Sequence, residues 1–201
     1  MGKVTVALAV SVDGFIAGPN DGKKHPLGEG GEALFEWYFN GDTPSRHYDR
    51  FRLSKKSADF FDAGLDASGA VVTGRRTYEI ANAWEGDGPV PGLPVFVLTH
   101  KAPAEPVKGS VPYTYVTDGI ESCIKQAKQA AGSKAVALTG SQSVQQALEA
   151  GLLDEVQLSI VPILLGGGVR LLDNISEQTK LETVEVIDAP GVTHITYKVL
   201  K

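Results

Sequence analysis

The stretch V-V-T-G-R-R-T-Y-E, residues Val71 to Glu79, runs from an apolar, β-branched segment directly into a glycine and two arginines. A continuous apolar run is typical of a strand that is buried on both faces of a sheet. In open α/β sheets, ligands bind beyond the carboxyl ends of the strands, and Arg75 and Arg76 stand at such an end. The stretch therefore predicts a core strand that leads into an anion-binding turn.

Two later segments repeat this design. A strand at Pro94–Thr99 ends in T-H-K, and a strand at Ala135–Thr139 ends in G-S-Q-S. Glycine lets a phosphate approach the backbone, hydroxyl groups and helix N-termini donate hydrogen bonds, and Arg and Lys neutralise charge. Three donor-rich turns predict a polyanion with separated phosphates, a description that NADPH fits. Any one turn has a simpler reading, in which the glycine only turns the chain and the arginines pair with Glu79 or Asp87 at the surface.

Strand-like and helix-like segments alternate along the chain, which predicts an α/β fold with a mostly parallel sheet covered by helices. Pro190-Gly191 marks a tight turn, so the last two strands must form an antiparallel hairpin. Neither a repeat nor a linker interrupts residues 1–201, and we expect a single domain. The predicted strands are Val4–Val10, Ala70–Thr73, Pro94–Thr99, Val111–Val116, Ala135–Thr139, Glu155–Leu165, Lys180–Ile187 and Val192–Leu200. The predicted helices are Gly31–Asn40, a polar one near Tyr48–Asp62, Arg76–Asn82, Ile120–Ala131 and Ser143–Ala150, the last with a capping box of Ser143 and Gln146.

Composition argues against several classes of partner. The chain has 201 residues and a net charge of -5, which disfavours a nucleic-acid surface. No apolar run approaches the roughly 18 residues that span a bilayer, so we expect no membrane segment. A single cysteine, Cys123, excludes an internal disulfide framework, and a cytoplasmic location is the default expectation. Four scattered histidines predict no metal site.

The segment S-V-D-G-F-I-A, Ser11 to Ala17, follows the first strand and offers the candidate catalytic groups. Asp13, beside Ser11, is placed to donate or relay a proton at the sheet edge. The alternative is that Asp13 only makes a turn with the backbone that follows it. Phe15, Ile16 and Ala17 would supply an apolar wall for a flat ring such as nicotinamide.

Two other segments carry candidate substrate contacts. In P-I-L-L-G-G-G-V-R, the backbone can approach a ligand at Leu165 and Gly166, and Arg170 is placed to meet an anionic group. The glycine run also has a plainer reading, as a bulge or loop at a sheet edge. On the first predicted helix, Glu36 and Trp37 are candidates, although helical spacing assigns part of that aromatic face to the core. Residues 41–58 are polar and either cover the site or form a solvated surface helix and loop.

These segments, together with P-V-F-V-L-T-H and L-T-G-S-Q-S-V, follow one another in an order that resembles the dihydrofolate reductase-like superfamily, and within it the RibD C-terminal domain type of bacterial reductase. The resemblance implies a three-layer α/β sandwich that binds NADPH. It implies reduction of a C=N or C=O group in a small heterocyclic or sugar-linked substrate, similar to the reaction of 5-amino-6-(5-phosphoribosylamino)uracil reductase in riboflavin biosynthesis. A homodimer formed through the C-terminal strands is also implied.

The family pattern implies a cofactor role for each matching residue. Two alternatives stay open, namely a non-catalytic nucleotide-binding or interaction module and a folate reductase. Folate reductases carry a lone carboxylate on the first helix, and neither Glu32 nor Glu36 matches its spacing cleanly. The implied cofactor contacts are Ile16 and Ala17 along the nicotinamide, Thr73, Gly74, Arg75, Arg76 and Thr77 at the phosphates, Leu98, Thr99 and His100 near the adenosine, and Gly140, Ser141, Gln142, Ser143 and Val144 around the pyrophosphate.

Overall fold

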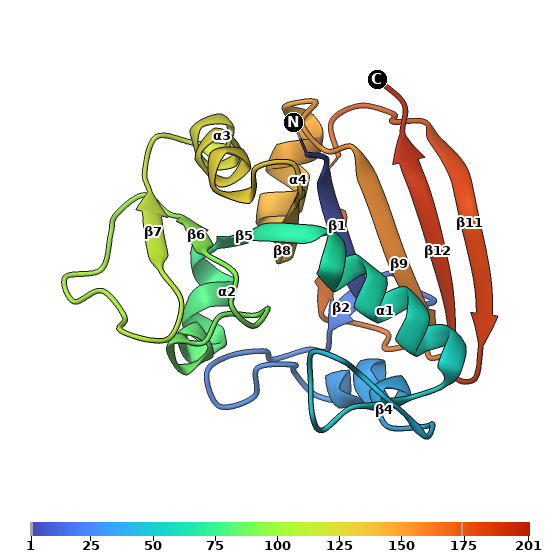
Figure 1. Cartoon of the computed structure of the whole chain (residues 1–201). Helices are drawn as coiled ribbons and strands as arrows, with labels where there is room; N and C mark the ends of the chain where they lie inside the picture. Colours follow the sequence, from blue (N-terminus) through green and yellow to red (C-terminus); the bar gives the residue numbers. More distant parts are fainter. Residues whose placement is uncertain (1, 174) are drawn as a thin grey trace.

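The computed structural model describes residues 2–173 and 175–201, and within these ranges eight strands form one sheet (Figure 1). The strand order is β11-β12-β9-β1-β8-β5-β6-β7. All eight predicted strands are present, most of them with ends shifted by a few residues. Their bounds are β1 (Val4–Ser11), β5 (Ser68–Gly74), β6 (Val95–Leu98), β7 (Tyr113–Val116), β8 (Ala135–Thr139), β9 (Glu155–Val161), β11 (Leu181–Ala189) and β12 (Val192–Val199).

The sheet is mixed, as the sequence predicts. The strands from β9 to β7 run parallel to one another, and β12 is antiparallel to both β9 and β11. The hairpin between β11 and β12 turns at Pro190-Gly191, where Ala189 pairs with Val192 and Gly191 has a φ of 74°. Two short antiparallel pairs were not predicted from the sequence, β2 (Phe15–Ala17) with β10 (Val169–Arg170) and β3 (Thr43–Pro44) with β4 (Arg52–Leu53).

Helices lie on both faces of the sheet (Figure 1). On one face, α3 (Ile120–Ala131) and α4 (Ser141–Glu149) pack over β1, β5 and β8 to form the main hydrophobic core, which includes Val4 and Val6. Because side chains alternate along a strand, Thr5 and Ala7, which follow Val4 and Val6, point to the opposite face. On that face α1 (Lys55–Ala67) packs against β12.

The remaining helices are short. The helix predicted at Gly31–Asn40 is the 3-10 helix η1 (Gly31–Tyr38), and the one predicted at Arg76–Asn82 is α2 (Arg75–Ile80), which is followed by the 3-10 turn η2 (Asn82–Gly86). Among the described residues, no helix is both long and apolar enough to cross a membrane.

Two helix starts differ from the prediction. The helix expected near Tyr48–Asp62 is α1, which begins only after Ser54, whose hydroxyl accepts the N–H of Ser57 as an N-cap. The predicted capping box at Ser143 is wrong because α4 begins earlier, directly after a glycine. The Ser143 hydroxyl lies inside the helix and donates a hydrogen bond of 2.6 Å to the carbonyl of Thr139.

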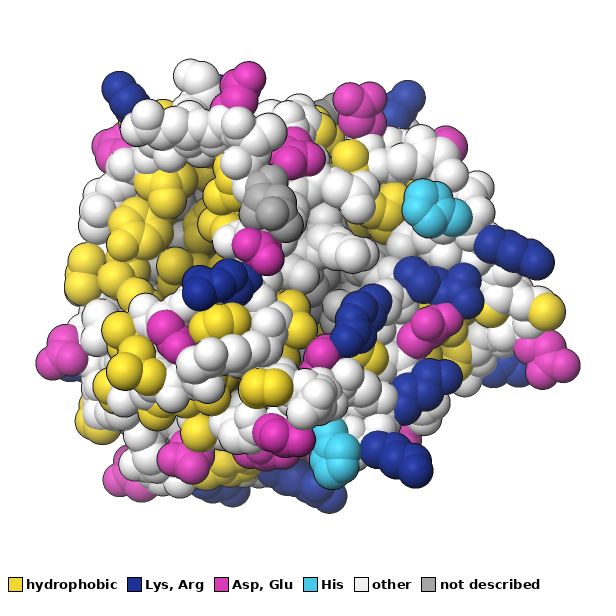
Figure 2. Space-filling model, turned by 180° about the vertical axis from the view of Figure 1, so that it is seen from behind, with side chains coloured by type: hydrophobic (Ala, Val, Ile, Leu, Met, Phe, Trp, Pro, Cys, Tyr) yellow, Lys and Arg dark blue, Asp and Glu magenta, His cyan; other side chains and the backbone are white. Residues whose placement is uncertain are grey.

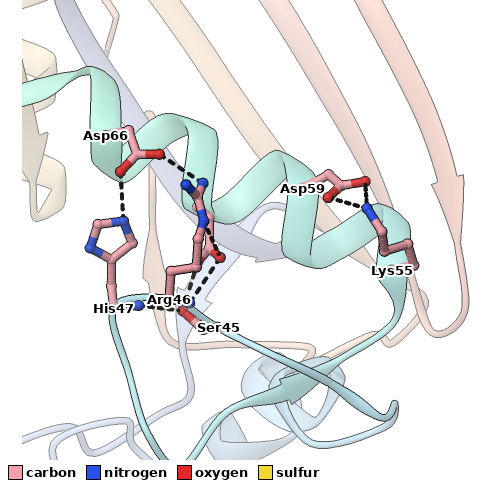
Figure 3. Close-up of polar contacts among 7 residues, drawn as sticks. Ser45, Arg46, His47, Lys55, Asp59 and Asp66 are labelled. Atoms are coloured by element: carbon pink, nitrogen blue, oxygen red, sulfur yellow. Dashed lines mark hydrogen bonds and ion pairs between the residues drawn. The ribbon is translucent and has the colours of Figure 1, made fainter.

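Residues 43–53, which contain β3 and β4, form hydrogen bonds and ion pairs with carboxylates of α1 (Figure 3). Asp62 accepts hydrogen bonds from the Ser45 hydroxyl at 2.7 Å and from the Arg46 backbone N–H at 2.9 Å. One turn further on, Asp66 pairs with Arg46 and His47. Burial opposes ionisation of Asp62, but the hydrogen bonds from Ser45 and Arg46 outweigh burial and lower its pKa. The segment is therefore held by a charged, almost fully buried group.

The substitution Asp62→Asn should lower the free energy of unfolding by about 2 kcal/mol, because it weakens charge-assisted hydrogen bonds and leaves a buried amide with mismatched partners. The matched control is Asp59→Asn, which breaks an exposed pair with Lys55 on the same helix and should change stability by at most about 0.5 kcal/mol. Urea denaturation measures both. Equal losses in the two variants would show that Asp62 does not anchor the segment.

Candidate active site

The carboxyl ends of β1, β8, β5 and β6 lie side by side at one edge of the sheet, because these four strands are parallel neighbours. In the register, Thr73 pairs with Thr139 and Gly74 with Leu98. The three donor-rich turns that the sequence analysis singles out, those after Thr73, Leu98 and Thr139, therefore meet at this edge. We call it the polar edge.

Both arginines of the polar edge already have protein partners. Arg75 pairs with Glu79, as the simpler reading of the turn predicts, and its Nη1 donates to the Lys101 carbonyl at 2.7 Å and to the Thr99 hydroxyl at 3.2 Å. Arg76 pairs with Asp21 at 2.7 Å. Their side chains stay 42% and 52% exposed, so each guanidinium is oriented yet still accessible to an anion.

Gly140 joins two of the turns. Its φ of 82° is one that other residues rarely adopt, and a Cβ placed on it would lie 2.3 Å from Oγ1 of Thr77. The glycine therefore brings the Thr77 hydroxyl against the start of α4. The first backbone N–H groups of that helix have no acceptor within it, which makes its N-terminus suited to a phosphate.

The predicted pyrophosphate residues divide into two groups. Ser141 and Gln142 stand at the start of α4, where their backbone N–H groups are available. Ser143 and Val144 are fully buried. The Ser143 hydroxyl bonds to backbone carbonyls, and Val144 packs in the main core, so these two offer only backbone to a ligand.

The carboxylate of Asp13 is held by the protein on both of its oxygens. It accepts hydrogen bonds from the Ser11 hydroxyl at 2.6 Å and from the backbone N–H groups of Leu165 and Gly166 at 3.1 and 2.7 Å. The Ser11 hydroxyl has the largest effect on the pKa of Asp13; burial opposes it, and the two backbone N–H groups help to lower the pKa to about 2. The group is therefore ionised near neutral pH, and its geometry favours the structural alternative over proton donation.

The predicted substrate residues Phe15, Leu165, Gly166 and Arg170 gather around Asp13. Arg170 donates to the backbone carbonyl of Asp13 at 2.9 Å, and its guanidinium lies 4.4 Å from the centre of the Phe15 ring. This cluster fixes the end of β1 to the loop that follows β9.

A cavity of about 650 Å³ lies on the face of the sheet that carries Thr5, Ala7 and Ala9. Its lining reaches the polar edge at Thr139, the last residue of β8. Of the predicted substrate residues, only Trp37 lines it, whereas Glu36 is exposed and lies outside the lining. Nine aromatic side chains form much of the remaining wall, namely Phe35, Trp37, Tyr38, Phe39, Tyr48, Phe51, Phe60, Phe61 and Trp84.

Most of this aromatic wall is missed by the sequence analysis. Residues 41–58 are interpreted there as polar, yet they contribute Tyr48 and Phe51 to the lining. The Tyr48 and Phe51 rings stack with centroids 4.7 Å apart, and the Tyr48 hydroxyl donates to the carbonyl of Pro89 at 2.6 Å. The clusters of aromatic residues at 35–39 and 60–61 are the one sign of this wall in the sequence, but only tertiary contacts bring the two clusters together.

Trp84 reaches the cavity from a strained turn. The φ angles of residues 82–85 lie between 48° and 55°, a left-handed conformation that costs roughly 1–2 kcal/mol per residue outside glycine. A hydrogen bond of 2.6 Å from the Tyr113 hydroxyl to the Ala83 carbonyl holds the turn. Strain of this kind is commonest at functional sites.

His194 lies behind the cavity wall and is fully buried. Its ring nitrogens contact the hydroxyls of Ser57 and Ser159, each at 2.9 Å, and its ring stacks on Phe60. Burial lowers the pKa of His194 to about 4, so the ring is neutral near pH 7. Ser159 also lines the cavity, which connects this buried pair of hydrogen bonds to the site.

The family model for the RibD C-terminal domain matches residues 2–194. The chain belongs to this family. It is 24% identical over 182 residues to the uncharacterized protein YwjB of Bacillus subtilis (strain 168), a match that covers 89% of this chain and 87% of YwjB.

Solved structures agree with this assignment. A putative riboflavin biosynthesis protein from Shewanella sp. PV-4 superposes with a TM-score of 0.75 at 23% identity and full coverage of both chains. A dihydrofolate reductase from Enterococcus faecalis, complexed with NADP(H) and RAB-propyl, superposes with a TM-score of 0.61 at 16% identity, covering 100% of this chain and 98% of that one. At these identities the likeness establishes the fold, which is the predicted dihydrofolate reductase-like sandwich.

The buried His194 predicts an acid-sensitive fold. The unfolded chain takes up a proton on this histidine near its ordinary pKa of 6.5, whereas the folded chain takes one up only near pH 4. The free energy of unfolding should therefore fall as the pH drops from 6.5 to 4, by about 3 kcal/mol from this residue. The variant His194→Gln, whose amide can form hydrogen bonds to both serines, should lack this loss of stability between pH 6.5 and 4. Identical pH profiles of stability in the two proteins would contradict the assignment.

Proposed function

We propose that this protein is an NADPH-dependent reductase that acts on a C=N or C=O group of a small cyclic substrate. The observation that carries the proposal is the continuity of the polar edge with the aromatic cavity at Thr139, the lining residue that directly precedes Gly140 and α4. Phosphates suit the edge, and planar rings suit the cavity. The NADP(H) complex of the Enterococcus faecalis dihydrofolate reductase, which shares the fold, supports the choice of cofactor.

The residues of the polar edge fit a dinucleotide. At the Gly140 turn the backbone lies directly against the Thr77 hydroxyl, with no room for a Cβ, and Arg75 and Arg76, in the same turn as Thr77, are oriented by their protein partners. These groups would bind the phosphates, and Ile16 and Ala17, on β2, are assigned to the nicotinamide. Bound NADPH would supply hydride. The accompanying proton is not assigned to Asp13, because that carboxylate is ionised near neutral pH and already accepts three hydrogen bonds within the protein.

A folate substrate has less support. Among the described lining residues, Glu155 is the carboxylate, and it is paired with Lys3 and also accepts a hydrogen bond from Gln157. On α1, Asp62 is held by Ser45, and Asp59 pairs with Lys55. The lining therefore lacks, among the described residues, a free carboxylate of the kind that folate reductases use to bind the pterin.

We also propose a homodimer through the C-terminal strands. The edge strand β11 exposes Val184 and Val186 by 60% and 58%, beside a 43% exposed Leu181. Figure 2 shows hydrophobic side chains gathered on the side of the molecule that carries these strands. An edge strand that exposes apolar side chains is a pairing surface for another chain, although β11 also carries the exposed Glu182, Glu185 and Asp188.

Cofactor binding tests the proposal most directly. The substitution Gly140→Ala should weaken NADPH binding at least about tenfold, because the methyl group would meet Thr77 at the phosphate turn. Gly151→Ala is the matched control, since Gly151 follows the other end of α4, also has a positive φ of 67°, and has open space around it. Titration of NADPH fluorescence measures both affinities, and thermal melting shows whether each variant is folded. If wild type does not bind NADPH, or if a folded Gly140→Ala variant binds it as tightly, the cofactor site is wrong.

The dimer has its own test. Sedimentation equilibrium of the wild type should give twice the chain mass of 21.3 kDa. The double substitution Val184→Lys and Val186→Lys should give monomers, because paired copies would bring the new charges together. Leu164→Lys replaces a 74% exposed side chain outside these strands and should leave the dimer intact. A monomeric wild type at micromolar concentration would refute the proposal.

A further inference from the structure

The cavity is nearly free of available charge. Among the described residues that line it, Lys3 and Glu155 are the ones with charged side chains, and they pair with each other at 2.8 Å. The hydrogen bond to Glu155 raises the pKa of Lys3, which keeps the ammonium group protonated beside its partner. A phosphate or carboxylate on a substrate inside the cavity would therefore find no unpaired cation among these residues, and burying it would cost desolvation without compensation.

The shape of the cavity favours a flat ring. Its floor is made by small side chains on adjacent strands, Ala7 and Ala9 of β1 and Ala137 of β8, where Thr5 pairs with Ala137 in the register. Aromatic side chains such as Phe60 line the rest. Planar rings stack on such side chains and against flat apolar surfaces, and about 650 Å³ accommodates a one- or two-ring compound.

One buried donor in the wall lacks a partner. Trp37 is 3% exposed, and its indole Nε1 has no hydrogen-bond acceptor among the described residues. The Nε1 atom is itself enclosed by the protein, so Trp37 presents only its apolar ring atoms to the cavity. The Trp37 ring packs edge-on against His194, with centroids 5.0 Å apart, and His194 in turn bonds to Ser159 of the lining. The polar groups of this wall are thus neutral.

We infer that the substrate is an uncharged, phosphate-free, planar ring compound that stacks between the alanine floor and the aromatic wall of the cavity. This inference rests on the proposed reductase function and narrows it. It separates the chain from reductases that act on a phosphoribosyl substrate, although the family is the same. In the reaction, the substrate carbon gains a hydride, its oxygen or nitrogen gains a proton from solvent, and NADPH becomes NADP⁺.

Matched ring compounds test the charge argument. Isatin is a neutral, planar dicarbonyl, isatin-5-sulfonate carries a fixed negative charge, and 5-nitroisatin is a neutral control of comparable size. Calorimetric titration of the wild-type protein should give dissociation constants for isatin and 5-nitroisatin at least about tenfold lower than for the sulfonate. The variant Glu155→Gln frees Lys3 and should tighten binding of the sulfonate while leaving isatin unchanged. Equal or tighter binding of the sulfonate to wild type, or no binding of either neutral compound, overturns the inference.

NADPH titration keeps the outcomes distinguishable, because failure to bind NADPH refutes the reductase, whereas NADPH binding with a preference for the sulfonate refutes only the substrate class.

Discussion

The parallel alignment of β1, β8, β5 and β6 is the constraint on which the site depends. Parallel neighbours end at the same edge, so polar residues that follow different strands must meet there. Two of these strands, β1 and β8, alternate large residues toward α3 and α4 with small ones toward the other face, as Val4 and Val6 alternate with Thr5 and Ala7. One face can therefore bury a tight core while the other leaves room for a ligand.

The wall of the cavity comes from segments that do not belong to the sheet. Residues 43–53 supply aromatic rings to it and are held against α1 by the carboxylates of Asp62 and Asp66 (Figure 3). Buried ionised groups that are fully hydrogen-bonded fix geometry more than they add stability. The charges thus stay on the outer side of the helix, and the ligand side stays apolar. This separation underlies the expectation of an uncharged ring substrate.

Asp13 and the two arginines show how a structural role and a ligand role combine at one edge. Asp13 holds the end of β1 in place by accepting hydrogen bonds from two backbone N–H groups. These bonds favour the ionised carboxylate, which is unsuited to proton donation. Arg75 ties α2 to the end of β6 while its side chain remains partly exposed. The simpler reading is correct for Arg75, which pairs with Glu79, and this pairing is compatible with anion binding because it holds the guanidinium in place. It is wrong in detail for Asp13, which bonds to the distant Leu165 and Gly166 and not to the backbone that follows it, and for Arg76, which pairs with Asp21.

The sequence alone determined the α/β class, the mixed sheet with its C-terminal hairpin, and the meeting of three polar turns at one edge. Those features follow from local periodicity and from turn residues such as Gly140 and Pro190-Gly191, which act over short distances along the chain. The cavity was decided only by the tertiary structure. Tyr48, Phe60 and Trp84 are far apart in sequence and lie in segments whose patterns differ, and the unpartnered Nε1 of Trp37 depends on which side chains surround it. Contacts of that kind depend on packing in three dimensions, which no local pattern specifies.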